Sequence, residues 1–322
     1  MRKLHLIILL NFAIVFNTFA QNYYKGFTLY APGNSTTAYL IDMNNSTVHT
    51  WSLNHTPAEK VYLLENGHLL ATGRDPSAQL NGGAVGGYIE EYDWDGNLVW
   101  QYHYSSSTYC LHHDICPMPN GNLLAIAWEV KTAAEAQAMG SSTYSERWPL
   151  HIIEIEKTGT YSGNIVWEWH LWDHLIQDYD SSKPNYGVVA DHPELMDINN
   201  IDGTGSKPPP TGGDWLHTNH IDYNDSLDQI CFSSHTLMEV YIIDHSTTTA
   251  EAAGHSGGNS GKGGDFLYRW GNPQGYDQGT SADQVFYVVH GGHWIDYDLP
   301  GGGDLMAFNN GIWSSRWKFI IS

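Results

Sequence analysis

The sequence has few cysteines, few cations and only one long apolar run. Its 322 residues include three cysteines, which are too few for a disulfide scaffold. Cys110 and Cys116 are close enough in sequence for a local bridge in an oxidising compartment, which would leave Cys231 unpaired. Fourteen Lys and Arg residues stand against 35 Asp and Glu, and the formal net charge is -21. Such an acidic exterior argues against nucleic acid and anionic membranes as partners.

The apolar run lies at the N-terminus. Two early cations, Arg2 and Lys3, precede the apolar residues 6–16, and a small residue, Ala20, precedes Gln21. This pattern is typical of a secretory signal peptide cleaved after Ala20, and the run is too short for a membrane span. We therefore expect residues 1–20 to be removed and residues 21–322 to form an exported protein, periplasmic or extracellular, with no membrane span.

Glycine and aromatic residues are abundant. The chain has 33 Gly, 13 Trp and 20 Tyr, which favour sheets with tight turns over helices. Hairpins that repeat at about 40 to 60 residues and end in tryptophan are typical of a β-propeller, whereas a β-sandwich would not ordinarily repeat one motif so often. We assign Trp51, Trp100 and Trp270 to packing between such hairpins. The repeats lie at 37–51, 64–72, 89–100, 118–126, 152–167 and 240–270.

The repeats predict an all-β fold with one propeller domain over residues 21–322. About five blades can be counted, whereas the expected ring has about six, so either the ring closes unusually or the chain is shortened at its C-terminus. Three insertions interrupt the repeat: a short helix within 131–147, a long excursion over 172–214 and a Gly- and Ser-rich loop over 246–264. Insertions of this kind commonly cap a binding face.

Histidine-bearing segments occupy comparable places in the repeat, near strand ends. In a propeller the equivalent ends of the inner strands face one central channel. We therefore expect His113, His217, His235 and His290 to converge there. His220 follows His217 by three residues, so on a regular strand only one of the two would point into a shared pocket.

Several functions are compatible with such a cluster. A metal site would use imidazoles together with a carboxylate, although short-spaced ligand pairs are absent around these histidines. Alternatively, one imidazole acts as a nucleophile and the others donate hydrogen bonds to a transferred anionic group. A non-catalytic propeller that binds an anionic or aromatic ligand remains open as well. Asp114 and Asp214 are expected to orient histidines or close turns rather than act as acids.

Taken in order, the motifs resemble those of a known family. Over residues 39–311 the chain is similar to the bacterial aryl-sulfate sulfotransferases, which work without a nucleotide sulfate donor. The resemblance implies a six-bladed propeller of an exported enzyme that moves a sulfuryl group from an aryl sulfate to a phenol by a ping-pong route, with no metal or cofactor. The segments that carry it are Leu111-His-His-Asp-Ile, Asp214-Trp-Leu-His-Thr-Asn, Ser233-Ser-His, Val288-Val-His-Gly-Gly-His-Trp-Ile, Leu267-Tyr-Arg-Trp-Gly-Asn-Pro and Phe308-Asn-Asn-Gly.

By this resemblance His290 is the nucleophile that carries the sulfuryl group. His113 and His217 bind its anionic oxygens, and Asn219 belongs to the substrate-binding residues. His112 is the alternative to His113, because a one-residue slip on a strand exchanges the two faces.

The chain departs from the family pattern at His235, where the family has an arginine after the paired serines. Arginine offers a fixed fork of donors and a permanent charge, whereas histidine offers at most two donors and is charged only when protonated. We expect sulfate binding to be weaker and more dependent on pH, unless Arg269 or another cation substitutes.

Overall fold

The computed structural model describes residues 25–200, 213–311 and 316–319, so the predicted signal peptide lies outside the described residues. Most of the described chain forms small sheets, numbered here in chain order. Sheet 1 contains β1 (Thr28–Tyr30), β2 (Thr37–Ile41) and β3 (Thr47–Ser52), and sheet 2 contains β4 (Pro57–Leu63), β5 (Leu69–Arg74), β6 (Gly87–Tyr92) and β7 (Leu98–His103). Sheet 3 contains β8 (Tyr109–Pro117), β9 (Leu123–Glu129), β10 (Leu150–Gly159) and β11 (Ser162–His170). Sheet 4 contains β14 (Thr218–Asn224), β15 (Gln229–Ser234), β16 (Glu239–Asp244) and β17 (Tyr268–Trp270), and sheet 5 contains β18 (Val289–Trp294), β19 (Leu305–Asn309) and β20 (Arg316–Phe319).

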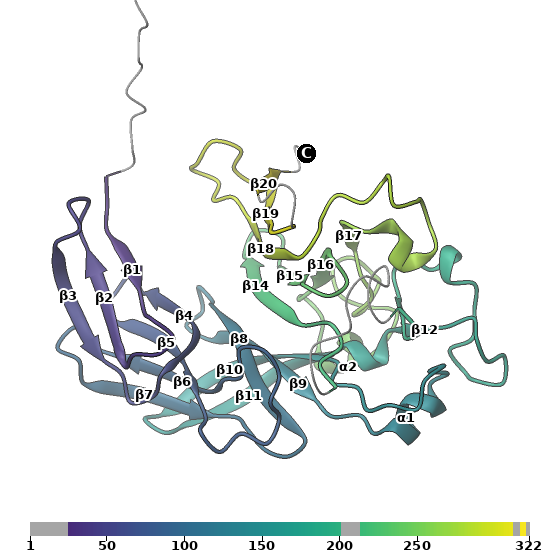
Figure 1. The fold of residues 1–322 in the computed structure, drawn as a ribbon, viewed down its shortest axis with the longest axis horizontal. Helices are drawn as coiled ribbons and strands as arrows, with labels where there is room; N and C mark the ends of the chain where they lie inside the picture. The colour runs from purple at the N-terminus through teal and green to yellow at the C-terminus, as the bar shows by residue number, and fades with distance from the viewer. Residues whose placement is uncertain (1–24, 201–212, 312–315, 320–322) are drawn as a thin grey trace, which may run out of the picture.

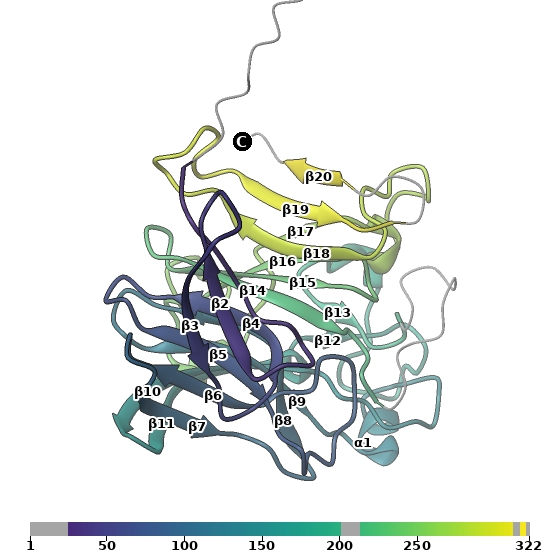
Figure 2. The ribbon, with the colours of Figure 1, turned by 60° about the vertical axis from the view of Figure 1, so that its left-hand side comes forward.

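The five sheets follow one another around a common centre (Figure 1). Each is an antiparallel meander in which consecutive strands pair. The first strands of successive sheets contact one another, because β4 lies against β8, β8 against β14, and β14 against β18. Figure 2 shows β18 and β14 crossing the molecule side by side. Residues on these first strands, although far apart in sequence, therefore share one central region.

Asn-Gly turns set the register of two hairpins. The turn between β4 and β5 has Gly67 at φ +83°, and the turn between β8 and β9 has Gly121 at φ +89°. A residue with a side chain adopts this left-handed conformation only at a cost, so glycine is favoured there. In both turns the side-chain oxygen of the preceding asparagine accepts the backbone N–H two residues on. The two hairpins predicted from these turns are confirmed.

Tryptophans on the outermost strands join each sheet to the next. Trp51 on β3 donates its indole N–H to the carbonyl of Asp93 in sheet 2 at 3.0 Å. Trp100 on β7 donates to the carbonyl of Ser162 in sheet 3 at 3.0 Å. Trp167 on β11 donates to a hydroxyl that follows β16 in sheet 4. All three indoles are buried, so the packing role predicted for Trp51 and Trp100 is confirmed.

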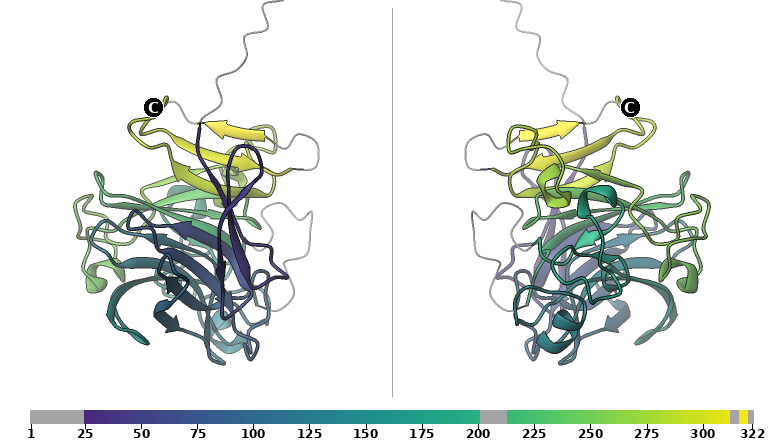
Figure 3. Two further views of the ribbon diagram at one scale, coloured as in Figure 1. Left: turned by 90° about the vertical axis from the view of Figure 1, so that its left-hand side faces the viewer. Right: turned by 90° about the vertical axis from the view of Figure 1, so that its right-hand side faces the viewer.

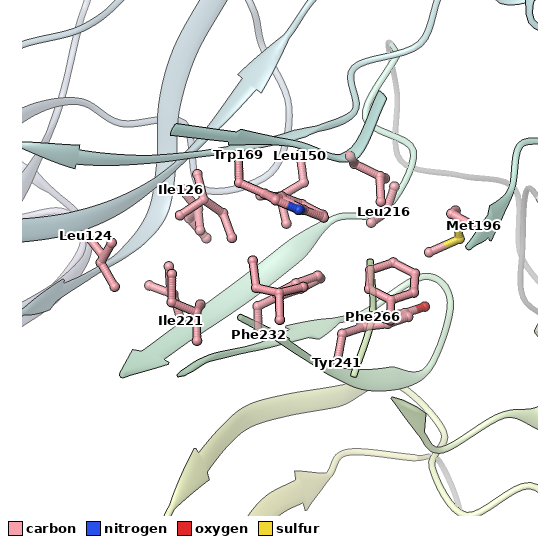
Figure 4. Close-up of a cluster of buried hydrophobic side chains, with 14 of the residues drawn as sticks. Leu124, Ile126, Leu150, Trp169, Met196, Leu216, Ile221, Phe232, Tyr241 and Phe266 are labelled. Carbon is pink, nitrogen blue, oxygen red and sulfur yellow. The ribbon is translucent and has the colours of Figure 1, made fainter. Parts of the chain in front are cut away.

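The hydrophobic cores lie between neighbouring sheets. Figure 4 shows the largest cluster, in which Ile126 and Trp169 of sheet 3 face Phe232 and Tyr241 of sheet 4. Smaller clusters join sheets 1 and 2, sheets 2 and 3, and sheets 4 and 5. Neighbouring sheets thus bury faces against one another, and residues of the insertions, such as Met196 and Ala252, take part in the largest cluster.

The insertions gather on one side of the molecule, opposite sheet 1 (Figure 3). The helix predicted within 131–147 is α1 (Ala133–Ala138), which begins with a capping box between Thr132 and Glu135. The excursion over 172–214 contains the parallel pair β12 (Leu175–Ile176) and β13 (Met196–Asp197), and the predicted loop over 246–264 contains α2 (Thr249–Ala252). The 3-10 helices are η1 (Leu171–Asp173), η2 (Val189–Asp191) and η3 (Pro273–Tyr276).

The predicted all-β class is confirmed, since small antiparallel sheets make up most of the described chain, but a propeller of about six blades is not. The described residues form five antiparallel sheets, and within them no strand of sheet 5 pairs with a strand of sheet 1. None of the described helices is both long and apolar enough to cross a bilayer.

The local disulfide considered for Cys110 and Cys116 is not formed. Cys110 pairs with Trp128 and Cys116 with Leu124 on β9, and these partners are four residues, or about 13 Å, apart along that strand, beyond the roughly 7 Å that a disulfide can bridge. All three cysteines are buried free thiols.

Candidate active site

Bulges interrupt the first strands of four sheets near the centre. An extra residue in one strand bends it and re-aims the side chains beside it. A strand that is irregular at this point can present neighbouring residues to the same side, which a regular strand cannot do. The register shifts fall between Pro57 and Val61 in β4, Leu111 and Ile115 in β8, Thr218 and His220 in β14, and His290 and His293 in β18.

Two of the predicted site residues have a strained backbone. His113 has φ +49° and His217 has φ +50°. Left-handed conformations are uncommon for residues with a side chain, and they cluster at functional sites, where the surrounding structure holds them. The two histidines occupy equivalent places, because each lies at the bulged part of a first strand or immediately before it.

The structure brings the four predicted histidines together in a continuous chain of rings. The ring centroids of His113 and His217 lie 4.6 Å apart, and those of His217 and His235 lie 5.0 Å apart. The ring of His290 follows at 5.5 Å from that of His235. We call these four residues the histidine chain. It joins sheets 3, 4 and 5 at the centre of the molecule.

His290 has one ring nitrogen fixed by the backbone. Its Nδ1 donates a hydrogen bond to the carbonyl of Val288 at 3.1 Å, which leaves the lone pair on Nε2. Burial lowers the pKa of His290, and the nearby charges of His217 and Lys60 lower it further. The imidazole is therefore neutral near neutral pH, which is the form that acts as a nucleophile.

His112 and His113 divide their tasks rather than compete. His112 stacks on Trp128 with ring centroids 4.2 Å apart, and its Nδ1 lies 2.8 Å from Nδ1 of His113. Burial lowers the pKa of His112 to about 3, so the ring is neutral. A proton on Nδ1 of His112 makes the same atom of His113 an acceptor and places the His113 proton on Nε2. When His112 donates in this way it fixes the tautomer of His113, whose ring belongs to the histidine chain.

Asp214 orients His217, as predicted. Its Oδ2 lies 2.6 Å from Nδ1 of His217, and its Oδ1 accepts the indole N–H of Trp128 at 2.9 Å. A carboxylate at Nδ1 accepts the proton of that nitrogen and fixes the orientation of the ring. Gly83 lies flat against the ring, since a Cβ on it would come within 2.2 Å of His217 Cε1.

The buried side chain of Asn219 forms hydrogen bonds that connect neighbouring strands. Its amide donates to the carbonyl of Val289 at 2.8 Å, and its Oδ1 accepts the hydroxyl of Ser233 at 2.7 Å. The side chain thus joins β14, β15 and β18 one residue before His290. These contacts favour a positioning role for Asn219, and its contact with the substrate stays a prediction.

Arg269 does not reach the histidine chain. It lies on β17, the outermost strand of sheet 4, and its Nη2 pairs with the buried Glu239 at 2.5 Å. The guanidinium also stacks on Tyr276 and donates to the carbonyl of Leu195 at 3.1 Å. With its donors used in this way it cannot substitute for an arginine at the position of His235.

A second polar group, which sequence reasoning did not assemble, lies beside the histidine chain. Nδ1 of His220 is 2.5 Å from Oδ2 of the fully buried Asp114, and Nζ of Lys60 is 3.7 Å from the same oxygen. Tyr62 donates its hydroxyl to Oδ1 of Asp114 at 2.9 Å. Asp114 therefore orients a histidine, as predicted. That histidine belongs to another sheet, and no spacing in the sequence connects them.

Among the described residues, two other groups offer histidine and carboxylate atoms that could hold a metal ion, and neither belongs to the histidine chain. The atoms of each group lie within 4.8 Å of one another. The two groups are His151, Glu168 and His170, and His174, His255 and Asp265.

Residues 254–258 have the G-x-S-x-G spacing of a nucleophile elbow. They form bends after α2 and lack the strand-to-helix turn that such an elbow requires.

Comparisons with known proteins identify a family. The family model described as Arylsulfotransferase (ASST) matches residues 15–319. No curated protein matches the sequence.

Solved structures resemble the chain only distantly. A protein of unknown function from Bacteroides caccae is 10% identical, with a TM-score of 0.43 over 91% of this chain and 72% of its own. Hydrazine synthase of Kuenenia stuttgartiensis is 13% identical, with a TM-score of 0.49 over 91% of this chain and 68% of its own. Virginiamycin B lyase of Staphylococcus aureus is 10% identical, with a TM-score of 0.38 over 94% of this chain and 72% of its own.

Proposed function

Because the chain belongs to the arylsulfotransferase family, we propose that it transfers a sulfuryl group from an aryl sulfate to a phenol through a covalent sulfo-histidine at His290. The observation that carries the proposal is the hydrogen bond from Nδ1 of His290 to the carbonyl of Val288. This bond leaves the lone pair on Nε2 for attack on the sulfur of the aryl sulfate. A five-sheet propeller-like arrangement would supply the central channel.

In the first half-reaction, Nε2 of His290 attacks the sulfur of the aryl sulfate. The N–S bond forms while the bond between sulfur and the aryl oxygen breaks, and the electron pair leaves with the phenolate. In the second half-reaction, the oxygen of an acceptor phenol attacks the same sulfur, and the pair of the broken N–S bond returns to Nε2. The departing phenolate gains a proton and the acceptor loses one, so the protons balance over a cycle.

The other histidines would stabilise the charge on the sulfuryl oxygens. His113 donates from Nε2 when His112 donates to its Nδ1, and His217, whose Nδ1 proton is held by Asp214, donates from Nε2 only as an imidazolium. Donors aimed at developing charge in a dry site each contribute about 3 kcal/mol to transition-state stabilisation. His235 lies between His217 and His290 and supplies a third imidazole.

Aryl sulfates fit this chemistry better than alkyl sulfates. A phenol has a pKa of about 10, so its anion leaves far more readily than an alkoxide. The site needs no nucleotide or metal in the steps described above.

The proposal is tested with 4-nitrophenyl sulfate as donor and phenol as acceptor. The wild-type protein is expected to release nitrophenolate, to form phenyl sulfate, and to carry one SO3 group on the peptide that contains His290. The His290→Ala variant is expected to lose at least about 10³-fold in release, as when a covalent nucleophile is removed. The same change at His192, an exposed residue paired with Glu194, serves as the control.

Two outcomes would favour other functions. Tight binding of the aryl sulfate without turnover would support a non-catalytic binding protein. Release that depends on a stoichiometric transition metal, or that persists in His290→Ala, would contradict the sulfo-histidine.

We also propose that the protein is exported, on the basis of the signal-like residues 1–20. Fractionation of cells that express the full chain tests this, and recovery of unprocessed protein from the cytoplasm alone would contradict it.

A further inference from the structure

Beside the histidine chain lies a second set of polar side chains that the transfer step leaves unused. His220 on β14, Asp114 on β8 and Lys60 on β4 come from three sheets and meet around one carboxylate oxygen, Oδ2 of Asp114. We call these three residues the proton-relay cluster. The side chain of Asp114 is fully buried, while those of His220 and Lys60 are 14% and 33% exposed. The carboxylate is thus internal, and the side chains of His220 and Lys60 reach toward accessible space.

Asp114 is held as a carboxylate by its surroundings. Burial alone would raise its pKa, but the facing His220 and Lys60 and the hydroxyl of Tyr62 outweigh burial and hold the pKa below its usual value. The backbone N–H of Ile115 adds a donor at 2.9 Å. An ionised, fully ordered carboxylate at Nδ1 of a histidine fixes the ring, keeps a proton on Nδ1 and leaves Nε2 to exchange one.

The cluster lies next to the nucleophile. Nζ of Lys60 lies 3.4 Å from Nδ1 of His220, and its charge is one of the causes that lower the pKa of His290. The ring of His220 is 6.0 Å from that of His293, which lies three residues after His290 on β18. His220 itself begins the regular part of β14, three residues after His217 of the histidine chain. The cluster and the nucleophile therefore share the contact between β14 and β18.

From this placement we infer that His220, held by Asp114, is the general acid and base for the aryl oxygen, and that Lys60 stabilises the phenolate. The inference rests on the proposed sulfuryl transfer. In the first half-reaction, the imidazolium of His220 gives its Nε2 proton to the departing phenolate as the S–O bond breaks. In the second, neutral His220 takes the proton of the acceptor phenol as its oxygen bonds to sulfur and the N–S bond breaks.

One group can serve both halves because the second half-reaction is the reverse of the first with a different phenol. The proton taken from the acceptor regenerates the imidazolium needed for the next donor. The other charged or titratable groups that face His220 are Asp222 on its own strand and His293 on β18. Asp222 accepts the backbone N–H of Trp294 at 2.9 Å and burial raises its pKa, whereas Nδ1 of His220 contacts Asp114.

The experiment compares two donors whose leaving groups differ in basicity. Phenyl sulfate releases a basic phenolate that needs a proton, whereas 4-nitrophenyl sulfate releases a weakly basic one that does not. We expect His220→Gln to lose about 10²-fold or more in kcat/KM with phenyl sulfate, the usual contribution of general acid catalysis, and less than about tenfold with 4-nitrophenyl sulfate. His290→Ala is expected to lose activity with both donors.

Two further variants separate catalysis from damage to the fold. Lys60→Met, at a partly exposed side chain, is expected to show the same preference for the better leaving group with an unchanged melting temperature. Asp114→Asn keeps the shape of the side chain, and its loss with phenyl sulfate should exceed that with 4-nitrophenyl sulfate, which a loss of folded protein would not produce. His192→Gln is the control.

The outcomes distinguish this inference from the transfer reaction itself. An equal loss with the two donors in His220→Gln, or no loss with phenyl sulfate, would overturn the role of His220 while nitrophenolate release and the sulfo-protein persist. Absence of any sulfo-protein in the wild type would overturn the transfer reaction and this inference with it.

Discussion

The ring of His235 lies 5.5 Å from the ring of His290, at an interplanar angle of 85°. His235 belongs to the turn between β15 and β16, and His290 to β18 of the next sheet. An edge-on imidazole at this place can donate to an anionic group carried by His290. His235 occupies the position at which the aryl-sulfate sulfotransferases that the sequence resembles have an arginine.

Replacing His235 by arginine is expected to strengthen donor binding. A guanidinium supplies a fixed fork of donors and a permanent charge, and a charge-assisted hydrogen bond contributes about 1.5–3 kcal/mol. We expect KM for 4-nitrophenyl sulfate to fall about tenfold at about pH 8, where an ordinary imidazole is neutral, and less at about pH 6. Steady-state kinetics at the two pH values checks this, and a KM that rises at both would contradict it.

We expect Asn219 to position His290, the proposed nucleophile, without contacting the substrate. Removal of its amide in Asn219→Ala takes away the side-chain donor to the carbonyl of Val289 and the acceptor for the hydroxyl of Ser233, which costs about 1–3 kcal/mol. Because Val289 precedes His290, we expect kcat to fall more than KM changes. Asn219→Asp restores one acceptor but not the donor, so it should not restore kcat. Urea unfolding and kinetics measure the two effects, and a change confined to KM would instead indicate direct contact with the donor.

Much of the fold but only part of the candidate site could be predicted from the sequence. Repeated hairpins and Asn-Gly turns are local signals, so the meanders and the packing of Trp51 and Trp100 could be predicted. Pairing between sheets is non-local, which is why the contact of Asp114 with His220 could not be predicted. The alternation rule would have placed only one of His217 and His220 toward the centre, but the bulge between Thr218 and His220 breaks the alternation.

The same limits explain the residues whose predicted roles changed. Arg269 looked available because a sequence does not show that it pairs with Glu239, which lies on the neighbouring strand two residues before Tyr241, the strand partner of Arg269. Asn219 looked like a ligand because it follows His217 in a motif, yet its amide is used between strands. In both cases a polar side chain satisfied a buried partner, which is the commonest fate of such groups in a folded core.

Gly83 should tolerate no side chain. A Cβ at this position would meet His217 Cε1 at 2.2 Å, far inside contact distance, so Gly83→Ala must displace the ring or the loop that carries it. We expect a loss of about 10²-fold in kcat/KM, similar to the loss of one oxyanion donor. Gly33→Ala is the matched control, because a Cβ there meets no atom within 4 Å. Equal activity of the two variants would show that the loop yields freely and that His217 is not held by it.

Buried His112 should make stability depend on pH. Its pKa is about 3 in the folded protein, because burial disfavours the charged ring, and about 6.5 in an unfolded chain. Between these values the unfolded chain binds a proton that the folded protein does not, so stability is lost as the pH falls from about 6.5 to about 3, at up to about 1.4 kcal/mol per pH unit. His112→Gln removes this proton and should flatten the dependence on pH, although it lowers stability near neutral pH by disturbing the stack on Trp128. Urea unfolding across this range measures the slope, and His192→Gln controls for loss of a histidine as such. A slope in His112→Gln as steep as in the wild type would mean that other groups account for the acid sensitivity.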